Sequence, residues 1–338
     1  MSIVSNVTRL QTAKADIAAA IIAKSGSVPD GIKLDGLHSC IIGIPTEEFA
    51  RKLVSGDSDI TSLPSTLTII RPYAFYEYQT LALTSLPDGI TSIGSNAFYN
   101  CVNITLSSLP SSITSIGSST FRGCSKIALT SLPDTLTGIG TYSFFGCTLL
   151  ALTTLPASIS TIGDYTFYYC SNLALTDIPS GVTTIGNQAF YNCTKLALTS
   201  LPSNITSIGN SAFGGCTNLA FTSLPNSITI IGSGAFANCE NITLTSLPSG
   251  IKSIANTSFL GCLKLAITDI PGGVTTIGSQ AFYNCGSLRR INIPSSVTSI
   301  TSSAFGMTVI TSITVNKPAN SIPGAPWGAE FATVTWTG

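Results

Sequence analysis

Apolar residues recur along this chain in a fixed order, separated by serine, threonine and glycine. In residues 79–101 the large apolar positions are Leu81, Leu83, Leu86, Ile90, Ile93 and Phe98. The first three favour a strand over residues 81–86, which Pro87 ends because proline cannot donate a hydrogen bond to a sheet. Residues 90–93 predict a second short extended segment, and the stretch SNAFYNC (95–101) predicts a short helical turn.

This order of residues returns every 23 positions. Proline keeps the step from Pro64 to Pro294, phenylalanine from Phe75 to Phe305 and cysteine from Cys101 to Cys285. Such regularity predicts a solenoid, in which each unit is one turn stacked on a similar turn. Because paired strands lie about 4.7–4.9 Å apart, about eleven units make a rod on the order of 50 Å long.

Glycine and asparagine occupy two recurring positions within the unit. The first position is glycine in most units, beginning with Gly94 and Gly117, and predicts either a positive φ or tight packing. The second directly precedes each cysteine and is glycine or asparagine in every unit except at Tyr169. These two residue types tolerate the left-handed conformation that ends a helical turn, so we expect a positive φ there.

The units SLPSSITSIGSSTFRGC and DIPSGVTTIGNQAFYNC resemble the BspA-type leucine-rich repeats. The resemblance covers about residues 56–315. It implies a leucine-rich-repeat solenoid that is mainly β with short helical turns and a parallel sheet, and it implies roles in surface attachment or protein binding. Most units read LALTSLP, whereas the last reads LRRINIP, which is closer to the family's usual strand. The register of the strand therefore stays open.

Both ends break the period and predict three parts in the chain. Residues 1–50 carry apolar positions at helical spacing and predict a small α-helical N-terminal head, which caps the solenoid of residues 51–308. Residues 309–338 predict a C-terminal β-rich cap, in which Trp327 and Trp336 cover the last turn. Both ends resemble parts of phage and prophage tail-associated repeat proteins.

Composition excludes several classes of protein. The net charge is zero and only 9% of the residues are charged, which disfavours a nucleic-acid partner because phosphate binding needs clustered lysine and arginine. The apolar runs are far shorter than the roughly 20 residues of a membrane span, so we expect no membrane insertion. No basic segment followed by a long apolar one begins the chain, so the sequence predicts no secretory signal within it.

The sequence predicts no catalytic residue, no metal site and no cofactor. The repeat cysteines lie one per unit, too far apart along the chain for a metal-binding motif, and we interpret them and Cys40 as buried free thiols. The single histidine, His38, is interpreted as structural rather than catalytic. Asp88 and Asp134 lie two turns apart, at about 10 Å by strand spacing, and sit where serine and asparagine also occur, so we interpret them as turn residues.

The candidate ligand-binding surface is the position that follows each phenylalanine. If the phenylalanine faces inward, its neighbour faces outward or sideways, and six of these ten neighbours are aromatic. The candidate residues are Tyr76, Tyr99, Arg122, Phe145, Tyr168, Tyr191 and Tyr283. Two interpretations remain: the rings bind a glycan or protein, or they only cover the adjacent unit. A second ladder, of threonines such as Thr91 and Thr114, is interpreted as structural.

These observations predict a non-enzymatic binding scaffold. The first hypothesis is a surface or adhesin-like module that recognises a protein or glycan. The second is a structural or host-recognition component of a phage or prophage tail, with residues 1–50 as its attachment head. The corresponding locations are the cell surface or the virion, and the sequence does not define the oligomeric state.

Overall fold

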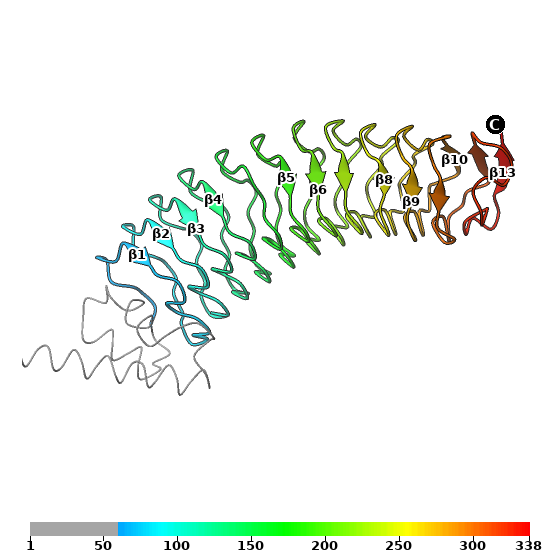
Figure 1. The fold of residues 1–338 in the computed structure, drawn as a ribbon. Coiled ribbons are helices and arrows are strands. Elements are labelled where there is room, and N and C mark those ends of the chain that lie inside the picture. The colour runs from blue at the N-terminus through cyan, green and yellow to red at the C-terminus, as the bar shows by residue number, and fades with distance from the viewer. Residues whose placement is uncertain (1–59) are drawn as a thin grey trace, which may run out of the picture.

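Residues 60–338 of the computed structural model form a curved rod of about twelve stacked turns (Figure 1). The predicted head at residues 1–50, together with His38 and Cys40, lies outside the described residues. Each turn lies directly on the next, as the 23-residue period predicts. The leucine-rich-repeat type of solenoid with parallel strands is therefore confirmed for the described part of the chain.

Short strands run along one side of the rod, and all their pairings are parallel. The strands are β1 (Ile69–Ile70), β2 (Ser92–Ile93), β3 (Ser115–Ile116), β4 (Gly138–Ile139), β5 (Thr184–Ile185), β6 (Ser207–Ile208), β7 (Ile230–Ile231), β8 (Ser253–Ile254), β9 (Thr276–Ile277), β10 (Arg290–Ile293), β11 (Ser299–Ile300), β12 (Ser312–Val315) and β13 (Thr333–Trp336). From β1 to β9 the second residue of each strand is a buried isoleucine, which lies beside the isoleucine of the next turn.

The strand predicted over Leu81–Leu86 is wrong, and the regular strand is the second extended segment, represented by β2. The segment Leu81–Leu86 buries its first, third and sixth residues. A strand alternates its faces every residue, so the step of three breaks the alternation and the ladder. In β10 the buried positions are two apart, and this segment does form a four-residue strand that pairs with β12.

The predicted helical turn is also wrong, because the described residues contain no helix. In SNAFYNC, Asn96 and Asn100 have φ of 57° and 54°, which an α-helix excludes. The Phe98 N–H donates to the Thr120 carbonyl of the next turn at 2.9 Å, while the Phe98 carbonyl accepts from the Cys101 N–H at 3.1 Å. The segment is therefore a run of tight turns bonded to the neighbouring coil.

The two glycine positions have different roles. The residues that precede the nine cysteines all have positive φ, from 54° at Asn100 to 77° at Gly123, which confirms that prediction. Gly94 and Gly117 do not have positive φ, so for them the alternative of tight packing holds. A Cβ on Gly117 would lie 2.4 Å from the Ser95 backbone nitrogen, which no side chain can tolerate.

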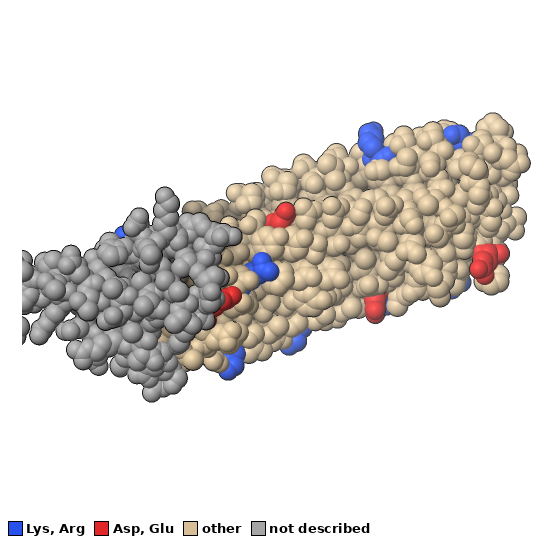
Figure 2. Space-filling model, turned by 60° about the horizontal axis from the view of Figure 1, so that its bottom comes forward, with Lys and Arg blue, Asp and Glu red and all other residues tan. Residues whose placement is uncertain are grey.

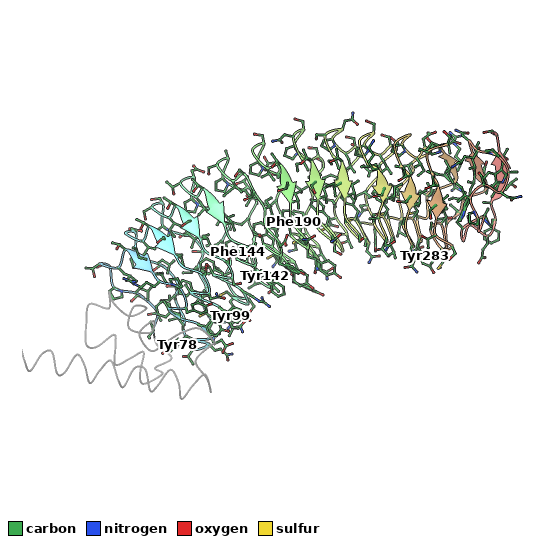
Figure 3. All side chains as sticks on the ribbon, viewed as in Figure 1. Tyr78, Tyr99, Tyr142, Phe144, Phe190 and Tyr283 are labelled. Atoms are coloured by element: carbon green, nitrogen blue, oxygen red, sulfur yellow. The ribbon has the colours of Figure 1, made fainter. Side chains whose placement is uncertain are left out.

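The core consists of columns in which equivalent side chains touch from turn to turn. The column of phenylalanines runs from Phe75 to Phe305 with ring centroids 5.3–5.7 Å apart and rings nearly parallel. The leucine, isoleucine and cysteine positions form further buried columns. Figure 3 shows Phe144 and Phe190 inside the rod. This continuous core makes the surface above it rigid.

The C-terminal segment continues the stack. Strands β12 and β13 extend the parallel pairing that begins at β10. Trp327 is fully buried, donates its indole N–H to the Pro323 carbonyl at 2.8 Å and lies 6.3 Å from the Trp336 ring. The boundary predicted after residue 308 stays a prediction.

Candidate functional site

The sequence-predicted surface row lies on the tight turns that follow the phenylalanine column. Because Phe98 points into the core, the next residue, Tyr99, points sideways and is half-buried. Figure 3 shows Tyr99, Tyr142 and Tyr283 along the lower edge of the rod, which is the inner side of its bend. The row is therefore carried by backbone that both neighbouring turns hold in place.

Six of the seven predicted residues form one continuous stack. The ring centroids of Tyr76 and Tyr99 are 4.7 Å apart. Further along, the rings of Phe145 and Tyr168 are 4.5 Å apart and those of Tyr168 and Tyr191 are 5.1 Å apart. Each pair is nearly parallel, so the rings stack face to face along the axis of the rod.

Arg122 fills the gap between the two groups of rings. Its guanidinium carbon lies 5.5 Å from the Tyr99 ring centroid and 4.5 Å from that of Phe145. It also lies 5.2 Å from the ring of Tyr142. Arginine stacks on aromatic faces through its planar guanidinium, so the cation takes the place of a ring in the row.

Tyr283 does not belong to this stack. Three turns without an aromatic residue at the row position, at Gly214, Ala237 and Leu260, separate it from Tyr191. Its hydroxyl donates to the sulfur of Met307 at 2.8 Å, and its ring lies where a side chain on Gly306 would otherwise be. The structure therefore groups six of the predicted residues and leaves the seventh apart.

A second row of rings was missed from the sequence. Tyr142 and Tyr165 occupy the position two residues before the phenylalanine, and their rings stack at 4.5 Å. Tyr73 lies at the same position and its ring centroid is 5.7 Å from that of Tyr76. The rings of Tyr165 and Tyr168 join the two rows at 5.6 Å. Aligning the units at 23 residues would have revealed the recurrence of tyrosine at this position.

Tyr169 departs from the pattern of its position. The other eight residues that precede a repeat cysteine are glycine or asparagine, and Tyr169 adopts the same left-handed backbone with φ of 57°. For a bulky residue this conformation costs roughly 1–2 kcal/mol. Its ring is 45% exposed and stands edge-on to Tyr168, at 4.7 Å and 64°. We call these two rows together with Tyr169 the aromatic face: Tyr73, Tyr76, Tyr99, Arg122, Tyr142, Phe145, Tyr165, Tyr168, Tyr169 and Tyr191.

The stacking determines which parts of the rings are open to a ligand. Within a row the ring faces contact each other, so the rows present ring edges and phenol hydroxyls to solvent. Desolvation raises the pKa of Tyr76, Tyr142 and Tyr168, with smaller contributions from nearby charges and tyrosines. The phenols therefore stay protonated at neutral pH and can donate hydrogen bonds.

The cysteine column has no reactive chemistry. The nine repeat cysteines are free and buried, as predicted, and each thiol donates to the phenylalanine carbonyl of the preceding turn at 2.9–3.1 Å. Burial raises the pKa of the Cys101 and Cys285 thiols to about 12. Reactivity requires a thiolate, so these groups are inert.

The threonine ladder forms hydrogen bonds between turns. The Thr91 hydroxyl donates to the Thr68 carbonyl at 3.2 Å, and the Thr137 hydroxyl donates to the Thr114 carbonyl at 3.2 Å. These bonds support the structural interpretation. Figure 2 shows that charged residues are scattered singly over a mostly uncharged surface. Within residues 60–338 no group of three or more histidine, cysteine or acidic side chains is placed to hold a metal ion, and no helix is long and apolar enough to cross a membrane.

One protein family matches most of this chain. The family model for the BspA type leucine rich repeat region matches residues 56–174, 128–243 and 208–325. No protein of curated function matches the sequence.

Solved structures that match this chain include leucine-rich repeat proteins. One from Bacteroides ovatus is 24% identical, covers 81% of this chain and 82% of its own, and has a TM-score of 0.57. A leucine rich cell surface protein from Faecalibacterium prausnitzii is 30% identical, covers 76% of this chain and 85% of its own, and has a TM-score of 0.48. A leucine rich repeat protein of T. pallidum is 33% identical over 54% of this chain and 86% of its own, with a TM-score of 0.43.

Proposed function

This chain belongs to the BspA type leucine rich repeat family, and from that premise we propose that it is a non-enzymatic binding scaffold that recognises a protein or a glycan through the aromatic face. The family's roles in surface attachment support a location at a cell surface. The rod holds its surface rigid, so little order is lost on binding and the affinity benefits.

The observation that carries the proposal is the concentration of tyrosines and one arginine on one edge of six adjacent turns. In the two turns that follow Tyr191 the corresponding positions are small or polar, as at Gly214 and Ser211. Tyrosine and arginine dominate the energetics of protein interfaces. Tyr169 adds support, because it is exposed and its ring stands edge-on to Tyr168.

A binding screen tests the proposal. The full chain is tested against arrays of host surface proteins and glycans, beside the variants Tyr168→Ala and Tyr283→Ala. We expect a ligand whose binding is weakened at least tenfold by Tyr168→Ala and is unaffected by Tyr283→Ala, which lies outside the aromatic face. A ligand that binds both variants as well as the unmodified chain would place recognition elsewhere on the rod.

The phage or prophage tail hypothesis is the second candidate, and the resemblance of the two chain ends supports it. In this proposal residues 1–50 attach the rod to a tail, and the solenoid presents its surface to a host. Tail genes beside the coding sequence would favour it. Their absence, together with binding of the chain to the surface of its own cell, would exclude it.

A further inference from the structure

Arg122 is the only cation among the ten residues of the aromatic face. It is half-buried, and its guanidinium is in contact with the rings of Tyr99, Tyr142 and Phe145. A guanidinium that stacks on ring faces keeps the N–H groups in its own plane available for hydrogen bonds to a ligand.

The side chain of Arg122 has no acidic partner among residues 60–338. No ion pair and no side-chain hydrogen bond joins it to another residue of that range. The two nearby acids are engaged otherwise. Glu77 bonds to the Tyr76 side chain, and the Asp164 carboxylate accepts from the backbone and side-chain nitrogens of Asn187 at 2.7 and 3.2 Å. Arg122 therefore carries the one positive charge of the aromatic face and has no ion-pair partner among residues 60–338.

The rings around Arg122 present the same polarity as the cation. The edge of an aromatic ring is positive and its face negative. Because the faces in the rows are covered by neighbouring rings, the open part of the surface presents positive ring edges and guanidinium N–H donors, while several phenol hydroxyls bond to neighbouring side chains, as Tyr76 does to Glu77. Such a surface favours an acceptor, and a planar guanidinium matches a carboxylate in two parallel hydrogen bonds.

We propose that the aromatic face binds an acidic segment of a protein partner, with one carboxylate of that segment paired with Arg122. The inference rests on the proposed function and deepens it. Stacked rows leave few ring faces for a sugar to stack on, which disfavours a neutral glycan. A single cation among the ten residues of the aromatic face matches one carboxylate among uncharged groups, and not the regular charges of an acidic polysaccharide.

A displayed library of random heptapeptides is the test, with selection on the full chain and on three variants. Arg122→Gln removes the charge, whereas Arg122→Lys keeps the charge and loses the planar guanidinium that makes two parallel hydrogen bonds. Lys126→Gln is the matched control, because it removes an exposed lysine two residues after Cys124. We expect peptides with a single Asp or Glu to be enriched by the unmodified chain and by Lys126→Gln. Enrichment should be lost with Arg122→Gln and reduced with Arg122→Lys.

One enriched peptide is then titrated against the unmodified chain and against its variants. Binding should weaken at least tenfold, about 1.4 kcal/mol, in Arg122→Gln, and by a similar factor when the peptide acid becomes its amide. The Tm of Arg122→Gln should stay close to that of the unmodified chain. If it falls, Arg122→Lys replaces Arg122→Gln in the binding comparison.

Three results would overturn the inference. The first is selection without acidic preference, including no selection at all. The second is acidic preference that persists in Arg122→Gln. The third is Arg122-dependent binding of uronate-bearing glycans in place of peptides. If peptides without acids are selected and their binding is lost in Tyr168→Ala, the proposed function stands and this inference alone fails.

Discussion

The thiol of Cys124 donates a hydrogen bond to the carbonyl oxygen of Phe98 in the preceding turn, over 2.9 Å. The same carbonyl accepts the backbone N–H of Cys101 at 3.1 Å, so one oxygen joins two consecutive turns. Repeating this arrangement nine times gives the rod a buried line of thiol hydrogen bonds next to the phenylalanine column. The coils are thereby bonded to each other inside the core as well as at the strands.

Phe190→Ala should lower the free energy of unfolding by about 3–5 kcal/mol, because a fully buried ring is lost. The ring stacks on Phe167 at 5.5 Å and Phe213 at 5.4 Å, so contacts on both sides disappear. The half-buried Tyr191 is the matched control, and Tyr191→Ala should cost only about 1–2 kcal/mol for the lost ring contacts with Tyr168 and Tyr169. Denaturant unfolding measures both. Equal losses would mean that Tyr191 belongs to the core.

Stability should fall as the pH rises above about 9. The pKa of Cys101 is raised by burial from its ordinary value of 9.0 to about 12 in the folded chain, and the other repeat thiols are raised as well. Between these values the unfolded chain has released thiol protons that the folded chain still holds. Each thiol therefore removes about 1.4 kcal/mol of stability per pH unit. Below pH 9 the contribution is constant.

Denaturant midpoints at pH 7, 9 and 10.5 under a reducing agent measure this slope. The raised pKa values of Tyr76, Tyr142 and Tyr168 act in the same direction, so Cys193→Ala is the control that isolates one thiol. That variant should show a shallower slope. An unchanged slope would mean that the thiols ionise equally in both states. Native thiols should also resist a thiol reagent at pH 8 and react once the chain unfolds.

Gly117→Ala should destabilise the chain by about 1–3 kcal/mol, because the new methyl group meets backbone that must move. Its Cβ would lie 2.4 Å from the Ser95 nitrogen. Gly138 lies on β4 in the next turn, and a Cβ built on it would have no other atom within 4 Å. Gly138→Ala should therefore leave thermal unfolding unchanged or raise the Tm slightly. A harmful Gly138→Ala or a neutral Gly117→Ala would contradict the packing described for these turns.

Tyr169→Asn should separate stability from binding. Asparagine occupies the equivalent left-handed position at Asn100 and Asn192, so the substitution removes strain while it removes the ring contacts with Tyr168 and Tyr191. These effects are each about 1 kcal/mol and oppose each other, so we expect stability within about 1 kcal/mol of the unmodified chain. Binding of a partner found in the screen should nevertheless weaken. Calorimetry gives the first quantity and titration of that partner the second. Unchanged affinity would remove Tyr169 from the aromatic face.

The 23-residue period predicts the stack, because turns of the same length place the same position of each unit side by side. Phe98 lies against Phe121 because the two residues occupy the same position in consecutive units. The period does not predict which segment forms the strand. The segment Leu81–Leu86 looks like a strand by residue type, and only the step of three between its buried residues argues against it. Whether such a segment forms a strand depends on its backbone conformation, which cannot be inferred from residue type alone.

The candidate site was predictable in part. The row that includes Tyr99 and Tyr191 follows from the position after the phenylalanine, and its interruption at Gly214 is visible in the sequence. The contribution of Tyr142 was missed because its side-chain direction depends on a positive φ, which a helical interpretation of the turn excludes. That the rings present edges depends on side-chain stacking across turns, which no local pattern contains.

Because every turn from Pro64 to Pro294 has the same length, a cut of 23 residues anywhere in that range rejoins the chain in register. Rods of different lengths can therefore arise by loss or duplication of a gene segment, because the rejoined turns pack against each other as neighbouring turns already do. Removing a turn between Gly214 and Leu260 would shorten the molecule without touching Tyr191 or any ring before it. The reach of the protein and its recognition surface can thus change independently during evolution.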